Sequence, residues 1–281
     1  AMGCVSSTPS SASPTVRSKS KSATASRENA WKTTGIVSLR DCNAREIPTK
    51  LLDADGDFAL KVRNLDAANN KLSTIPREIG NCTNITRLVL SNNALEALPG
   101  EVGRLVKLKI LICDDNRLKT LPVEIASCRA LTTLGVKGND LDSIPSEISQ
   151  CADLVNVNFR MNRNLGTGVL DVLADCVKLE EIDVSSCAIT IVPARLSNLK
   201  SLKVLAVDDN ACVETIPSAV FKSCTALTKL SAHGTSIRNV EYIDGYDAYV
   251  ERVKARHGKI ISGDVMIVGA RGLDYGFDYK T

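Results

Sequence analysis

The sequence has little of what catalysis, metal binding or membrane spanning requires. Only two of its 281 residues are histidine, and aromatic residues make up 4%. No run of 18 apolar residues is present, so no transmembrane helix is predicted. The common nucleotide-binding, nucleophile and zinc motifs are missing, and no Cys and His residues are spaced as metal ligands. These absences predict a protein that is not an enzyme and that uses no cofactor.

A strong charge of either sign is also missing. The 35 basic and 32 acidic side chains give a net charge of +3. Proteins whose main partner is a nucleic acid usually carry a much larger positive charge. We therefore expect no nucleic-acid partner.

The ten cysteines do not form a recognisable disulfide or metal pattern, because no C-x-x-C pair is present. Many recur six residues before an apolar position of a repeated unit, as in Cys82, Cys128, Cys151, Cys176 and Cys224. Cysteines placed in this way behave as small buried hydrophobic residues. The sequence thus predicts reduced thiols and a cytoplasmic protein.

A period of 23 residues runs through the middle of the chain. It is carried by Leu65, Leu88, Leu111 and Leu134, and again by Pro76, Pro99, Pro122 and Pro145. A fixed period in this range is typical of a solenoid, in which each repeat buries its apolar face against its neighbours. The predicted fold is an α/β solenoid with a parallel sheet on its concave face and a helical cap at its C-terminal end.

Nine strands are predicted, with side chains that alternate between the core and the concave face. They start at or near Val37, Leu65, Leu88, Leu111, Leu134, Val157, Ile182, Leu205 and Leu230. An asparagine follows most strands, and we expect its amide to bind loop backbone groups that would otherwise be buried without partners. Asn116 is expected to be essential to stability. Asn210 is expected to matter less, because an extra residue follows it before Val213.

The chain divides into three predicted segments: residues 1–34 as a low-complexity tether, residues 35–240 as about nine repeats, and residues 241–281 as a cap and tail. The tether is rich in Ser and Thr and has too few apolar residues to fold alone. The cap is expected to contain a helix over residues 244–256, with Asp244 as its N-cap and Gly258 ending it.

The N-terminal segment carries a motif for lipid attachment. In Met2-Gly3-Cys4-Val5-Ser6-Ser7, Gly3 fits the pattern for N-myristoylation and Cys4 is placed for palmitoylation. One myristoyl chain binds membranes only marginally, at about 10⁴ M⁻¹, so Cys4 or the basic stretch from Arg17 to Lys32 would supply a second signal. The alternative is that a short Met-Gly start occurs by chance. The motif predicts a peripheral membrane protein held by a lipid anchor.

The concave face carries a candidate site for a protein partner. Its predicted members are an exposed apolar spot and a charged rim: Val89, Ile110 and Ile112 in the spot, and Arg87, Asp114, Lys137 and Arg160 in the rim. An apolar centre with a charged rim is typical of interaction sites. The alternative is that β-branched residues simply suit strands.

We expect the protein itself to be a monomer.

The repeats, of the form Leu121-Pro122-x-Glu124-Ile125-x-x-Cys128-x-x-Leu131, resemble those of the plant and Ras-associated type of intracellular leucine-rich repeat proteins. Stretches outside the repeats, Met2-Gly3-Cys4 and Trp31-x-x-Thr34-Gly35-Ile36 among them, carry a closer match. The resemblance implies a lipid-anchored cytosolic scaffold or adaptor in signalling, without enzymatic activity. Two alternatives stay open: a regulatory subunit that positions a phosphatase or a small GTPase, and a substrate receptor of an enzyme complex such as a ubiquitin ligase.

Overall fold

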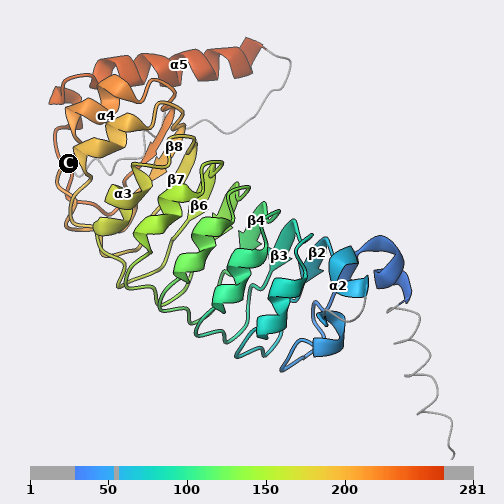
Figure 1. Ribbon diagram of the computed structural model, residues 1–281. Coiled ribbons are helices and arrows are strands. Elements are labelled where there is room, and N and C mark those ends of the chain that lie inside the picture. Colours follow the sequence, from blue (N-terminus) through green and yellow to red (C-terminus); the bar gives the residue numbers. More distant parts are fainter. Residues whose placement is uncertain (1–28, 54–56, 263–281) are drawn as a thin grey trace, which may run out of the picture.

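The computed structural model describes residues 29–53 and 57–262, with side chains as far as residue 255 but without that of residue 57. Nine parallel strands follow one another in sequence order to form a single curved sheet (Figure 1). This arrangement confirms the predicted α/β solenoid. The strands are β1 (Ile36–Ser38), β2 (Asn64–Asp66), β3 (Arg87–Val89), β4 (Ile110–Ile112), β5 (Thr133–Gly135), β6 (Asn156–Asn158), β7 (Glu181–Asp183), β8 (Val204–Ala206) and β9 (Lys229–Ser231).

The strand register agrees with the repeat period. Leu65 pairs with Leu88, Leu88 with Leu111, and so on across the sheet. The central residue of each of the nine strands is at most 3% exposed. Because side chains alternate along a strand, the residues on either side of it face the concave surface. The predicted strand phase is therefore correct.

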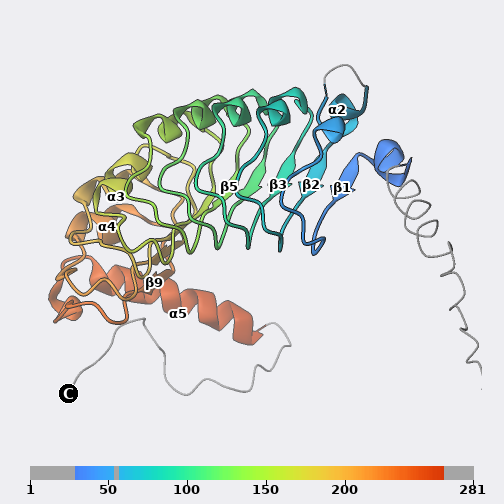
Figure 2. The same cartoon turned by 90° about the horizontal axis from the view of Figure 1, so that it is seen from below.

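The convex side is formed by short helical turns that return the chain to the next strand (Figure 2). A proline precedes most of them and fixes the extended backbone at which each turn begins. In η2, for example, the Ile79 N–H donates to the Pro76 carbonyl oxygen at 3.1 Å. The convex elements are η1 (Thr49–Leu51), α2 (Asp57–Lys61), η2 (Arg77–Asn81), η3 (Gly100–Arg104), η4 (Val123–Ser127), η5 (Ser146–Gln150), α3 (Gly168–Leu173), η6 (Ala194–Asn198) and α4 (Ser218–Ser223).

Neighbouring turns on the convex side approach one another very closely at Gly103. A Cβ atom on this residue would lie 2.4 Å from the carbonyl oxygen of Glu124. That distance is far inside van der Waals contact, so a side chain at this position would force η3 and η4 apart. The tight stacking of these two turns depends on glycine at residue 103.

The C-terminal cap consists of η7 (Val240–Tyr242) and α5 (Tyr246–Ser262). Tyr246, Tyr249 and Val253 are buried along one face of the helix. Two details of the prediction are wrong. Asp244 lies before the helix and pairs with the Lys222 ammonium on α4, and α5 continues through residue 258 to residue 262. The ion pair across to α4 occupies the carboxylate that was expected to cap α5.

The five cysteines that were predicted to be buried are buried. All nine described cysteines are free; six of them are buried, whereas Cys42 and Cys212 are exposed. Burial raises the pKa of Cys82 to about 11. The pKa of Cys128 is raised to about 12, mainly by burial and to a smaller extent by the charge of Cys151. A thiol with so high a pKa stays protonated at neutral pH and is a poor nucleophile. The buried cysteines are therefore packing residues.

Candidate functional site

The structure brings the seven predicted partner-binding residues onto one face of the sheet, across strands β3 to β6. Arg87 pairs directly with Ile110 and Val89 with Ile112, because these residues occupy equivalent positions of β3 and β4. Asp114, Lys137 and Arg160 each lie two residues beyond the end of their strand, in one column that runs across the sheet. Together these residues make up the concave site.

The apolar centre of the concave site is less open than the sequence suggested. Val89, expected to be exposed, is only 5% exposed, and Ile110 and Ile112 are half-buried. Adjacent strands are only about 4.8 Å apart, so longer side chains on the neighbouring strands cover a short one. Arg87 and Arg160 are exposed as predicted. Within the concave site, the accessible apolar surface therefore consists of the two isoleucines of β4.

Asp114, which was predicted to be part of the charged rim, instead bonds to the backbone of the next repeat. Its Oδ1 atom accepts a hydrogen bond of 2.9 Å from the Lys137 N–H. The same oxygen and the Cδ1 atom of Ile112 lie over Gly135, 3.0 and 3.1 Å from where a Cβ atom would be. Burial raises the pKa of this carboxyl group, and the hydrogen bond from Lys137 opposes that rise. Asp114 thus holds two repeats together, and Gly135 provides the space for it.

A second carboxylate of this type lies at the C-terminal end of the sheet. Asp208 accepts hydrogen bonds of 2.8 Å from the Ser231 hydroxyl and of 2.7 Å from the His233 N–H. No function was predicted for Asp208 from the sequence. The signal available there was the same as for Asp114: an Asp-Asp pair that begins two residues after a strand. Both pairs link one repeat to the next.

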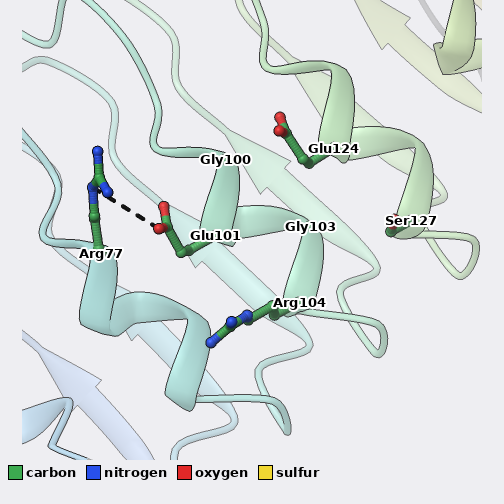
Figure 3. A pocket seen from close by; sticks show the side chains of 7 residues that line it. All are labelled: Arg77, Gly100, Glu101, Gly103, Arg104, Glu124 and Ser127. Atoms are coloured by element: carbon green, nitrogen blue, oxygen red, sulfur yellow. Dashed lines mark ion pairs between the residues drawn. The ribbon is translucent and has the colours of Figure 1, made fainter.

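The convex side carries a shallow depression of about 470 Å³ between η2, η3 and η4 (Figure 3). Arg77, Glu101, Arg104 and Glu124 line it, and the Arg77 Nε atom lies 3.9 Å from a Glu101 carboxylate oxygen. Small-molecule sites are mostly apolar with a few polar groups. This depression is polar, its charges balance, and it exists where Gly100 and Gly103 lack side chains. We assign no binding role to it.

The described part of the chain shows no grouping of three or more His, Cys, Asp or Glu side chains that could hold a metal ion. Among the helices that the structure describes, none is both long enough and apolar enough to cross a bilayer. The lipidation residues Gly3 and Cys4 lie outside the described residues.

Comparison with known proteins identifies the repeat. The leucine-rich repeat family model matches residues 61–82. A curated relative, plant intracellular Ras-group-related LRR protein 7 of Oryza sativa subsp. japonica, is 41% identical over 73 residues. That match spans 26% of this chain and 26% of the rice protein, so it covers about a quarter of either one.

Solved structures show the same fold. The leucine-rich repeat domain of the type III effector XCV3220 (XopL) aligns with a TM-score of 0.63 at 22% identity, over 80% of this chain and 77% of that one. The ectodomain of the Arabidopsis thaliana receptor kinase GASSHO1/SCHENGEN3, solved in complex with Casparian strip integrity factor 2, aligns with a TM-score of 0.59 at 26% identity. It covers 68% of this chain and 23% of that one. The chain is thus a leucine-rich repeat solenoid, an architecture that generally serves protein–protein interaction.

Proposed function

We propose that this leucine-rich repeat solenoid is a scaffold whose protein partner binds the concave site, and that an acylated N-terminus tethers it to a membrane. The observation that carries the first part is the pair of half-buried isoleucines on β4, Ile110 and Ile112, on a face without core demand. Arg87 and Arg160 are exposed on either side of this pair. Apolar anchors set among charged groups often contribute most of the energy of an interface.

The partner that best fits this face presents an apolar side chain to β4 and carboxylates to Arg87, Lys137 and Arg160. Arginine makes strong paired hydrogen bonds with carboxylates, which would orient the partner. The Arabidopsis ectodomain, solved in complex with Casparian strip integrity factor 2, supports a role of the fold in binding protein ligands.

Changing Ile112 to Asp tests the concave site. We expect loss of the partners recovered with the wild-type protein by affinity purification and mass spectrometry. The free energy of unfolding of the variant should differ from that of wild type by no more than about 1 kcal/mol, because Ile112 is only half-buried. The matched control is Ile191→Asp, since Ile191 is 64% exposed on another part of the surface.

If Ile112→Asp fails to fold, Ile112→Ser removes the apolar anchor without adding a carboxylate beside Asp114. Recovery of the same partners with a folded Ile112 variant as with wild type would exclude the concave site. If Ile191→Asp loses the partners and Ile112→Asp keeps them, the binding site lies at the loop that contains Ile191 and not on the concave face.

Changing Gly3 to Ala tests the tether, because N-myristoylation requires glycine at this position. We expect the wild-type protein to partition to membranes in cells and the Gly3→Ala variant to be released. Cys4→Ser should weaken retention and leave a reversible remainder, since one acyl chain binds only marginally. Equal membrane fractions for wild type and Gly3→Ala would exclude an acyl anchor at Gly3.

A further inference from the structure

Parallel strands give this solenoid two unlike lateral faces. The segments that lead into the strands form one, here called the amino face: residues 29–35, 58–63, 82–86, 105–109, 128–132, 151–155, 174–180, 199–203 and 224–228. The loops that leave the strands form the opposite carboxyl face: residues 40–47, 68–74, 91–97, 114–120, 137–143, 160–165, 185–191, 208–215 and 233–239. The overall charge of +3 conceals how differently these two faces are charged.

The amino face is strongly basic. Its three acidic residues are Asp153, Asp175 and Glu180, and its nine basic residues are Lys32, Lys61, Arg63, Lys107, Lys109, Arg129, Lys178, Lys200 and Lys203. Nine against three gives a net charge of +6. The carboxyl face carries nine Lys and Arg against ten Asp and Glu, a net charge of −1. The difference between the two faces arises from the repeat register, so composition alone does not reveal it.

The positive charge is concentrated at strands β2 to β4. Lys61, Arg63, Lys107 and Lys109 are all exposed there, and none forms an ion pair with a described carboxylate. The acidic residues of the amino face lie further along, where the Lys178 ammonium is 2.7 Å from Asp153 and that of Lys203 is 2.6 Å from Glu180. The positive charges near β2 to β4 are therefore not neutralised by described carboxylates of the amino face.

The N-terminal segment joins the fold on this same face. Residues 29–34 are helical and lead through Gly35 into the amino end of β1 (Figure 2). The described chain thus begins on the face that carries the basic groups of β2 to β4.

We infer that the amino face docks on an anionic phospholipid surface. Its lysines and arginines are spread along a row of strands about 4.8 Å apart, which suits diffuse charge rather than one buried ligand. Single-stranded nucleic acid would need exposed aromatic side chains for stacking, and Trp31 and Phe58, the aromatic residues of this face, are half-buried. The inference goes beyond the proposed function, because it requires neither the acyl chain nor the concave partner.

The test uses the full chain carrying Gly3→Ala, so that no acyl group contributes. Co-sedimentation compares vesicles of phosphatidylcholine alone with vesicles that also contain phosphatidylserine. Each basic residue near an anionic leaflet raises partitioning roughly fivefold. The double variant Lys107→Glu/Lys109→Glu should therefore lower partitioning to the anionic vesicles by at least roughly twentyfold.

The matched control is Arg117→Glu/Lys119→Glu, which makes the same charge change on exposed residues of the carboxyl face. It should leave partitioning nearly unchanged, because salt screens charges beyond a Debye length of about 8 Å. Thermal unfolding establishes that both variants fold.

If both double variants lose partitioning to the anionic vesicles equally, binding depends on net charge alone, and the amino face is not a docking surface. Equal binding of the parent chain to neutral and anionic vesicles would also overturn the docking surface. Tighter binding to polyglutamate than to phosphatidylserine vesicles at equal charge would reassign the face to acidic proteins. Since Gly3→Ala is present throughout, none of these outcomes bears on the acyl anchor.

Discussion

Replacing Asn116 with leucine is expected to lower the free energy of unfolding by about 3–5 kcal/mol, as measured by urea denaturation. The Asn116 side chain is 8% exposed. Its Oδ1 atom accepts the Leu95 N–H at 3.1 Å, and its Nδ2 atom donates to the carbonyl oxygens of Leu90 and Cys113, both at 3.0 Å. Leucine has a similar size but would leave these backbone groups buried without partners, at about 1–3 kcal/mol for each unsatisfied group.

The control for this substitution is Asn164→Leu. Asn164 is exposed in a loop, so the same chemical change there should alter stability by no more than about 0.5 kcal/mol. Equal denaturation midpoints for Asn116→Leu and wild type would show that the loops do not depend on this amide.

Asn210 gives a second comparison, and here the structure corrects the sequence analysis. The extra residue in this repeat is accommodated in a turn, in which the Val213 N–H donates to the Asn210 backbone carbonyl. The Asn210 side chain keeps the full pattern: it accepts from the Ile189 N–H at 3.0 Å and donates to the Val184 and Val207 carbonyl oxygens at 3.0 and 2.9 Å. We therefore expect Asn210→Leu to cost as much as Asn116→Leu.

The sequence was sufficient to predict the repeat fold for a physical reason. Every repeat must fill the same slot between its neighbours, so core positions recur at a fixed interval and one strand determines the phase of all the others. The Pro positions, such as Pro76 and Pro99, predicted the turn toward the convex side, because a fixed φ begins each helical turn there.

The state of the concave site was harder to predict, because it depends on contacts between strands. The sequence placed Val89 and Asp114 on the correct face but could not show that neighbours bury Val89. Nor could it show that Asp114 bonds to the next strand across the space left by Gly135. The basic amino face was missed for a related reason: its charges belong to different repeats and become neighbours only through the strand register.

Replacing Tyr249 with alanine is expected to cost about 3–5 kcal/mol, because it removes the centre of the C-terminal cap. The ring of Tyr249 lies 5.7 Å from that of Phe221 on α4 and 5.9 Å from that of Tyr246. Its hydroxyl oxygen accepts the Leu230 N–H at 3.0 Å, which satisfies a donor on β9, the last strand of the sheet. An uncovered edge strand exposes such groups to water and to other chains.

Two further variants separate the parts of this contribution. Tyr249→Phe keeps the ring and removes only the acceptor for Leu230, so it should cost about 1–2 kcal/mol. Tyr242→Ala removes a ring that is 82% exposed and should change stability by no more than about 0.5 kcal/mol. Hydrogen exchange supplies the local measurement: the Leu230 amide should exchange faster in both Tyr249 variants, whereas the Leu111 amide on β4 should change less, because each repeat contacts only its neighbours. If Tyr249→Ala unfolds at the wild-type midpoint, α5 contributes nothing to the repeats and the last strand must be stabilised without it.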